Sequence, residues 1–238
     1  MEKKYELTDE ILEVGGHVLH RIKALRDFGN VKKGDIGGCI ECEDNLSHYG
    51  DCWVYGNAKV YGDAEVYGNA IVYGDAEVYG DAEVYGNAKV YGDAEVYGNA
   101  IVYGDAEVYG DAEVYGNAKV LGNAEVYGNA KVYGDAEVYG NAKVYGDAEV
   151  YGNAIVYGNA IVYGNAEVEK KSDYIVFKNW WSSGRYFTWT RSNDMWRVGC
   201  FYGTGEELIK KAYNDSDESG REYKRIVKYV ESIKQELK

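Results

Sequence analysis

Four potential soft metal ligands lie close together near the start of the chain. Cys39, Cys42, His48 and Cys52 are separated by two, five and three residues. Cysteine and histidine sets of this kind hold structural zinc, although this spacing differs from that of a zinc knuckle. The alternative is that the cysteines are buried or partly exposed thiols. We therefore expect no metal and no other cofactor, and these four residues are the candidate ligands if a metal is bound.

Aromatic and arginine side chains gather in a second place, after residue 179. The candidate ligand-binding residues there are Trp180, Trp181, Arg185, Trp189, Arg191, Trp196 and Arg197. Arginine beside aromatic rings can stack on and clamp a planar anion such as a nucleotide. The alternative is ordinary core packing, with arginine stems lying along the core. If the chain binds a small ligand, we expect the ligand here.

The sequence contains few residues in arrangements that are typical of catalytic sites. The three histidines, His17, His20 and His48, all lie before residue 54. No Gly-rich phosphate loop, Ser-His-Asp set or HExxH motif stands out. A general base must reach the proton that it abstracts. We predict that the chain has no catalytic residues and is not an enzyme.

A six-residue repeat without insertion or deletion occupies the middle of the chain, between the Cys/His set and the Trp/Arg set, and must position both. The pattern Val-Tyr-Gly-(Asn/Asp)-Ala-(Lys/Glu/Ile) runs 19 times from Val54 to Glu167, and Leu121 replaces one tyrosine. Six residues is not a helical period, whereas side chains two apart in a strand share a face. We expect Ala and Val to point inward and the Lys/Glu/Ile position to point outward. Tyr-Gly-(Asn/Asp) must then turn a corner, where glycine adopts positive φ readily.

The repeat resembles the hexapeptide-repeat family over about half of the chain. That family folds as a left-handed parallel β-helix with three hexapeptides per triangular coil. The resemblance implies a mainly β protein with about six regular coils, roughly 30 Å long at about 4.8 Å per coil. We predict an N-terminal β cap and irregular first coil at 1–53, the β-helix at 54–168, and a small α+β module at 169–238.

The module is predicted to have the order βββαα. Three segments rich in β-branched and aromatic residues, 174–178, 185–191 and 195–201, predict strands. A capping box from Thr204 to Glu207 predicts a helix to about Tyr213. A second helix is expected from Asp215 to Leu237, with an apolar stripe of Ile226, Tyr229, Val230 and Ile233.

The acidity of the chain belongs to the repeat. The net charge is −14, and residues 54–167 contribute −13 of it, with 18 acids against 5 lysines. Three hexapeptides per coil place six acids on one face: Asp75, Glu77, Asp93, Glu95, Asp111 and Glu113. This face is either a solvated wall or a docking surface for a basic partner. The acidity argues against direct nucleic-acid binding, which depends on Lys and Arg.

Eighteen tyrosines of the repeat are expected to stack in three ladders at the corners. Stacked aromatic pairs stabilise one another by about 0.5–1.5 kcal/mol each. Structural stacking is therefore sufficient to explain the repeated tyrosines. Tyrosine is also enriched at interface hot spots, so the ladders could equally be binding surfaces.

The flanks are similar to uncharacterised phage and prophage hexapeptide-repeat proteins of gut bacteria. The similarity rests on RIKALRDFGNVKKGDIGG leading into NLSHYGDCWVYGNA, and on WWSSGRYFTWTRSNDMWRVGCFYGTGEELIKKAY. It implies a viral origin and the cytoplasm of the infected host. The chain has no apolar run long enough to span a membrane and no secretory signal, which also favours a cytoplasmic protein with free thiols.

The leading functional hypothesis is a non-enzymatic acidic scaffold or binding protein that engages or inhibits a host factor, for example in an anti-defence role. It would act through a DNA-like acidic surface or by trapping a nucleotide-like ligand in the C-terminal module. One alternative is an acyltransferase, but those relatives use a histidine base and this repeat has none. Another is a structural protein of the virion or its assembly. We expect a host protein partner and a homo-oligomer, since relatives are commonly trimers; the outward apolar positions are Ile71, Ile101, Ile155 and Ile161.

Overall fold

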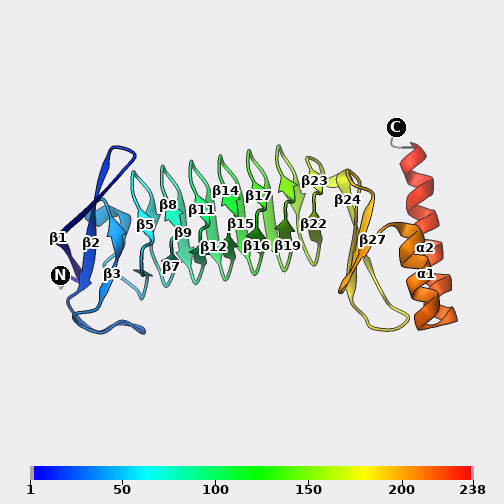
Figure 1. The fold of residues 1–238 in the computed structure, drawn as a ribbon, viewed down its shortest axis with the longest axis horizontal. Helices are drawn as coiled ribbons and strands as arrows, with labels where there is room; N and C mark the ends of the chain where they lie inside the picture. Colours follow the sequence, from blue (N-terminus) through cyan, green and yellow to red (C-terminus); the bar gives the residue numbers. More distant parts are fainter. Residues whose placement is uncertain (1–2, 237–238) are drawn as a thin grey trace.

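The protein is an elongated β-solenoid with a β cap at one end and an α+β module at the other (Figure 1). This computed structural model describes residues 3–236. Each hexapeptide supplies one short strand and one corner, and each strand pairs in parallel with the strand 18 residues later. Val90, for example, faces Val72 on one side and Val108 on the other. The predicted fold class, a parallel β-helix with three hexapeptides per coil, is confirmed.

The coils build three flat walls, which we number by the order in which the regular repeat enters them. Wall 1 contains β3 (Ile36–Ile40), β5 (Lys59–Val60), β8 (Glu77–Val78), β11 (Glu95–Val96), β14 (Glu113–Val114), β17 (Lys131–Val132), β20 (Glu149–Val150) and β23 (Glu167–Val168). Wall 2 contains β6 (Glu65–Val66), β9 (Glu83–Gly86), β12 (Ile101–Gly104), β15 (Lys119–Gly122), β18 (Glu137–Gly140) and β21 (Ile155–Val156). Wall 3 contains β4 (Trp53–Val54), β7 (Ile71–Gly74), β10 (Lys89–Gly92), β13 (Glu107–Gly110), β16 (Glu125–Gly128), β19 (Lys143–Gly146) and β22 (Ile161–Gly164).

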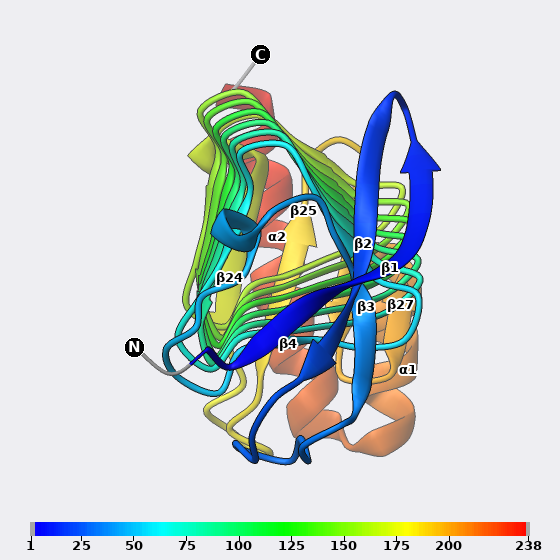
Figure 2. The same cartoon turned by 90° about the vertical axis from the view of Figure 1, so that its left-hand side faces the viewer.

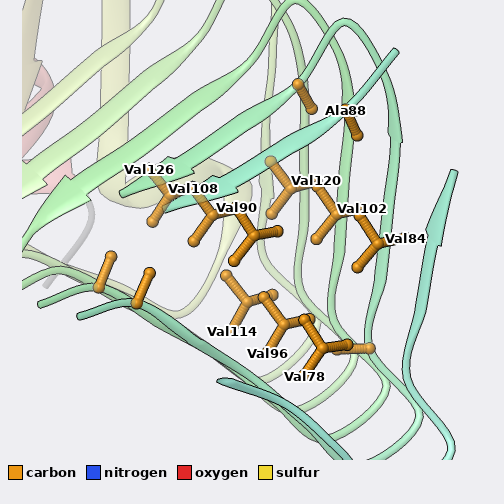
Figure 3. Close-up of a cluster of buried hydrophobic side chains, with 14 of the residues drawn as sticks. Val78, Val84, Ala88, Val90, Val96, Val102, Val108, Val114, Val120 and Val126 are labelled. Carbon is orange, nitrogen blue, oxygen red and sulfur yellow. The ribbon is translucent and has the colours of Figure 1, made fainter. Parts of the chain in front are cut away.

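Alanine and valine fill the solenoid, as the alternation predicts. Every Ala and Val of the repeat is buried, and the valines of successive coils lie in columns (Figure 3). The residue between them, such as Glu95 between Ala94 and Val96, points outward and is partly exposed. Two small apolar side chains per hexapeptide therefore suffice for a continuous core, because the three walls approach closely.

An irregular first coil precedes the regular ones. Strand β3 pairs in parallel with β5, Leu46 forms a bridge with Val66, and β4 pairs with β7. The short 3-10 helix η1 (Glu43–Asn45) lies between β3 and Leu46. The seven strands of wall 3 thus include one from this coil, which makes about seven coils in all.

Tyrosines stack along the solenoid at spacings set by the coils. On wall 1, six rings from Tyr61 to Tyr151 form one ladder, with neighbouring centroids 4.8–5.3 Å apart. The ladder of wall 2 is interrupted where Leu121 stands between Tyr103 and Tyr139. The predicted ladders are confirmed.

A long hairpin closes the N-terminal end. Strands β1 (Tyr5–Val14) and β2 (His17–Ala24) extend the sheet of wall 1 by antiparallel pairing onto β3, and the hairpin projects beyond the coils (Figure 2). The Tyr5 hydroxyl donates to the carbonyl oxygen of Leu46 at 2.7 Å. Trp53 and Phe28 pack edge to face beneath it. These aromatic residues cover the end of the core that the first coil would otherwise expose.

Side-chain hydroxyl groups close the C-terminal end of each wall. The Tyr174 hydroxyl donates to the Ile155 carbonyl oxygen of wall 2 at 3.0 Å. On wall 3, the Ile161 N–H donates to Thr188 Oγ1 at 2.8 Å. On wall 1, the Glu167 N–H donates to Ser192 Oγ at 2.7 Å. The last strands thus gain partners for backbone groups that an open edge would leave unpaired.

The C-terminal module is an antiparallel sheet covered by two helices. Its elements are η2 (Lys171–Asp173), β24 (Tyr174–Lys178), β25 (Tyr186–Thr190), β26 (Met195–Val198), β27 (Phe201–Gly203), α1 (Gly205–Asp215) and α2 (Asp217–Glu236). The capping box at Thr204 is confirmed, with the Glu207 N–H donating to Thr204 Oγ1. The module has four strands instead of the predicted three, because Gly199 at φ +58° turns segment 195–201 into a hairpin.

The predicted apolar stripe of helix α2 is confirmed in part: Val230 is buried, and Ile226 packs against the same core. Tyr223, Val227 and Val230 are buried against the sheet, whereas Tyr229 is 56% exposed. The end predicted at Leu237 lies outside the described residues. None of the helices in residues 3–236 has the length and apolarity needed to cross a bilayer.

Candidate functional site

The three walls carry very different charges. Within the regular repeat, wall 1 with its leading corner carries four Asp and five Glu against two Lys, a net charge of −7. Wall 2 carries three Asp and three Glu against one Lys, which gives −5. Wall 3 carries one Asp and two Glu against two Lys, which gives −1. Wall 1 is therefore the candidate functional surface, and wall 3 is its natural comparison.

Three glutamates form the central column of wall 1. Glu95 lies in register between Glu77 and Glu113 on adjacent strands. Lysines flank the run: Lys59 Nζ is 2.6 Å from Glu77 Oε1, and Lys131 Nζ is 2.8 Å from Glu113 Oε1. For Glu95, the described part of the chain contains no such lysine partner, and its bond comes from the Tyr79 hydroxyl at 2.9 Å. Negative charge is therefore least compensated at the middle of the column.

Three aspartates run parallel to this column along the adjacent corner. Asp75, Asp93 and Asp111 occupy the same position in successive coils, and the Asp75 and Asp93 N–H groups donate to glycine carbonyl oxygens of the next coil at 2.9 Å. Asn57 Nδ2 donates to Asp75 Oδ1 at 3.1 Å. The six predicted acids thus lie on one surface, in two parallel columns. Within each column, neighbouring acids are one coil apart. Their role in binding stays a prediction.

Wall 3 shows how the same repeat neutralises itself. Lys89 Nζ lies 2.7 Å from Glu107 Oε1, and Lys143 Nζ lies 2.6 Å from Glu125 Oε1. The Lys89 ammonium, the Tyr91 hydroxyl and other nearby positive charge hold the pKa of Glu107 below its ordinary value. The glutamates of wall 3 are therefore paired with lysines, whereas wall 1 keeps an excess of negative charge.

Tyrosine hydroxyls donate to glutamates along the outward faces. On wall 1, Tyr61 donates to Glu77 at 2.9 Å and Tyr97 to Glu113 at 3.2 Å. Burial, followed by the bond and charge of the glutamate, raises the pKa of Tyr61 well above its ordinary value. The glutamates that present charge are thus held in place by the ladder, and the ladder stays protonated at neutral pH.

The predicted Trp and Arg residues do not form a single site. Trp189 and Trp196 are buried between the sheet and the helices. Trp189 Nε1 donates to Asp194 Oδ1 at 2.8 Å, and Lys234 lies over its ring. Trp181 packs edge to face on Tyr223. These indoles are therefore part of the core of the module.

The arginines and the remaining tryptophan lie apart from that core. Arg197 turns to the solenoid, where Nε donates to the Tyr145 hydroxyl at 2.7 Å and the guanidinium carbon lies 4.8 Å from the ring centroid of Tyr163. Arg191 lies 3.8 Å from Asp173. Trp180 is 72% exposed. Both faces of β25 are buried, one on the helices and one on the last coil, and this separates side chains that the sequence places together.

Arg185 borders a cavity in the C-terminal module. The cavity, of about 370 Å³, lies between the loop after β24 and the start of α2. Ser182, Ser219 and Tyr223 also line it, as does Asp215. The serine hydroxyls and the arginine suit an anion, whereas the aspartate opposes one.

The four candidate zinc ligands are not brought together. Cys39 packs with Leu19 and Tyr61 outside the solenoid, whereas Cys52 lies in the main core. The Cys42 thiol lies 3.5 Å from an amide oxygen. His48 Nδ1 accepts the Lys4 N–H at 3.2 Å. Within residues 3–236, no group of three or more His, Cys, Asp or Glu side chains has the arrangement of a metal site.

The other two histidines also have local partners in the cap. His17 Nδ1 lies 2.9 Å from Glu41 Oε2, and His20 Nδ1 lies 3.1 Å from the Thr8 carbonyl oxygen. A surface pocket of about 640 Å³ is nearby and is lined by Glu43, Asp63 and their neighbours. It is an acidic hollow on the irregular first coil.

Sequence comparison adds one local similarity. Residues 148–164 match the family described as YdcK beta solenoid repeat. No curated protein matches the chain. The matched segment covers β20, β21 and β22, the last full coil of the array. The uninterrupted six-residue repeat and the parallel coils show that the middle of the chain is a parallel β-helix built from hexapeptides.

Proposed function

We propose that the chain is a non-enzymatic binding protein in which the solenoid is a rigid acidic rod and wall 1 docks a basic surface of a partner protein. The observation that carries this proposal is the concentration of negative charge on wall 1, at −7 against −1 on wall 3. Stacked like charges are mildly destabilising. The excess of negative charge on wall 1 therefore does not itself stabilise the fold.

The repeat itself shows that the fold does not need these acids. Both Asn and Asp occur at the corner position, and the backbone bond is the same for both: the Asp75 N–H donates at 2.9 Å and the Asn87 N–H at 2.8 Å. Lysine replaces glutamate in the outward column without a change of strand register, as at Lys131 beside Glu113. The charge of a wall is therefore free to serve a partner.

The partner that fits best is a protein with an elongated basic groove, such as a DNA-binding protein of a bacterial host. Charges along a straight column attract such a groove over several coils. A phage origin, a cytoplasmic location and a homo-oligomer belong to this proposal. The histidines engaged in the cap, away from the repeat, support a binding role over an acyltransferase.

A charge-neutral variant tests the acidic wall. Asp75→Asn, Asp93→Asn and Asp111→Asn together place the repeat's own residue at three adjacent corners. The matched control is Asp63→Asn, Asp81→Asn and Asp135→Asn on wall 2, which removes the same charge. Affinity capture from a bacterial lysate, eluted by salt and quantified by mass spectrometry, should retain a basic protein on wild type and control but lose it on the wall 1 variant. Equal capture by both variants would refute the docking surface.

Ligand trapping by the C-terminal module is a second proposal, restricted to the cavity beside Arg185. The cavity volume of about 370 Å³ suits a small anion-bearing ligand. Binding should quench the fluorescence of Trp181, which packs on the cavity residue Tyr223. Titration with nucleotides should give saturation that Arg185→Ala abolishes. A flat titration of the wild-type chain would remove this alternative.

A further inference from the structure

A lysine side chain is buried in the N-terminal cap beside a cysteine. Lys4 is 0% exposed, and so is Cys52. Lys4 Nζ lies 3.1 Å from Cys52 Sγ and donates to the Cys52 carbonyl oxygen at 2.8 Å. The ring of Phe28 lies 5.0 Å from the amine. A nitrogen nucleophile and a sulfur atom are therefore held at near-attack distance in an apolar site.

Burial favours the reactive, neutral form of the Lys4 amine, and the Lys4 charge is what favours the reactive thiolate of Cys52. Burial is the main cause that lowers the pKa of Lys4, so the neutral amine is more populated than in water. Burial raises the pKa of the Cys52 thiol, and the Lys4 charge opposes that rise. A proton shared between the two gives either an amine beside a thiol or an ammonium beside a thiolate.

A surface pocket lies close to the buried sulfur, on the far side of a short loop. Cys52 Sγ is 3.4 Å from the Ser47 carbonyl oxygen and 3.6 Å from that of Tyr49. Both residues line the pocket of about 640 Å³ on the first coil. Opening of this short loop would admit a molecule of the size of hydrogen peroxide.

We propose that Lys4 and Cys52 are a redox modification site, at which hydrogen peroxide joins the lysine nitrogen to the cysteine sulfur in a reversible sulfenamide cross-link. The site is independent of wall 1 and of the function proposed above. Its product fastens the first strand of the cap to the first coil across 48 positions of the chain.

The chemistry balances in two steps. First, the thiolate sulfur attacks one oxygen of the peroxide; the S–O bond forms, the O–O bond breaks, and the departing hydroxide takes a proton to leave as water. Second, the neutral Lys4 amine attacks the sulfur of this sulfenic acid; the N–S bond forms, the S–O bond breaks, and the hydroxide leaves with a proton from nitrogen as a second water. Sulfur is oxidised and the peroxide is reduced. Two equivalents of an external thiol reverse the bond and leave as a disulfide.

A second buried cysteine is the internal control. Cys39 is 3% exposed, and burial raises the pKa of its thiol as well. Its apolar neighbours are Leu19 and Tyr61. Cys39 shares burial with Cys52 but does not have a lysine amine in hydrogen-bonding contact within the described residues, so only Cys52 should cross-link.

The test is peptide mapping of the full chain after treatment with hydrogen peroxide. Digestion without reductant should give a linked pair of peptides containing Lys4 and Cys52, lighter than their sum by two hydrogen atoms. Dithiothreitol should abolish the link. Lys4→Met and Cys52→Ser should abolish it too, whereas Lys3→Met and Cys39→Ser should keep it.

Stability gives a second readout. The oxidised wild-type chain should melt at a higher temperature than the reduced chain, because the cross-link restricts the unfolded state. The rise should be absent in Lys4→Met. Wild-type protein in which peroxide oxidises Cys52 to a sulfinic acid, or leaves it unmodified, without a linked peptide would overturn the proposal. That measurement on the wild type does not depend on any variant folding.

Discussion

Substituting alanine at two corner glycines separates backbone strain from contact between coils. Gly104 and Gly158 both have positive φ, +86° and +70°. A Cβ added at Gly104 would lie 3.0 Å from the nitrogen and oxygen of Gly122 in the next coil, whereas at Gly158 it would meet nothing within 4 Å. The left-handed conformation costs an alanine about 1–2 kcal/mol at either position. Crowding of the next coil should cost a further ~1–3 kcal/mol at Gly104 alone.

The expected result is that Gly104→Ala lowers the free energy of unfolding by about 2–5 kcal/mol and Gly158→Ala by about 1–2 kcal/mol. Urea unfolding followed by far-ultraviolet circular dichroism measures both free energies. In Gly104→Ala, amide hydrogen exchange should become faster in the coil that contains residue 104 and in the next coil. Gly104→Asn is a further control, because asparagine tolerates positive φ but keeps the Cβ. If both alanine variants lose the same stability, contact between coils does not dictate glycine at the corners.

Three other predictions concern the ladders and the caps. Leu121→Tyr should complete the ladder of wall 2 and raise the free energy of unfolding by about 1–3 kcal/mol, for two new ring stacks; no gain in urea unfolding would contradict this. Burial and the Glu125 charge raise the pKa of Tyr109 to about 12, so the folded state keeps a proton that the unfolded chain loses near pH 10. Stability from this group is therefore constant below about pH 10 and falls between about pH 10 and 12, which alkaline absorbance titration and melting should show together; a single tyrosine transition near pH 10 would count against it. Thr188→Val should cost about 1–3 kcal/mol, because the Ile161 N–H is left unpaired; unchanged melting would show that water replaces the hydroxyl.

The solenoid could be predicted from the sequence almost completely, since each element follows from local rules. Ala and Val two apart must share a face, and a glycine every sixth residue must turn a corner. The same rule places Glu77, Glu95 and Glu113 in one column, because the 18-residue coil fixes their register. Regular repeats therefore convert sequence positions directly into surface positions.

The C-terminal module resisted prediction because its packing is not local. Strand β25 reads as one apolar and one polar face, yet Thr188 and Thr190 are as buried as Trp189, since the last coil covers them. The Arg197 bond to Tyr145 spans 52 positions, and nothing near either residue signals it. Proximity of Trp and Arg in sequence thus predicted a cluster that the sandwich of coil, sheet and helices divides.

The burial of Lys4 could not be predicted from its neighbours in the sequence and is seen only in the folded chain. A lysine that follows another lysine reads as solvated, and burial of a lysine is rare unless it is paired. Here the Tyr5 hydroxyl donates to the Leu46 carbonyl oxygen, and the preceding side chain, Lys4, lies under the cap beside Cys52.

The C-terminal module is held in one orientation relative to the acidic wall 1. Arg197 bonds the module to the Tyr145 and Tyr163 rungs of wall 3, while Ser192 and Tyr174 bond it to walls 1 and 2. The module is thus fixed to all three walls and cannot turn about the rod axis without breaking these bonds. A partner bound along wall 1 would therefore meet the module in one orientation. Because the repeat tolerates exchange of Asp for Asn and Glu for Lys, the surface that such a partner reads can change without changing the rod that presents it.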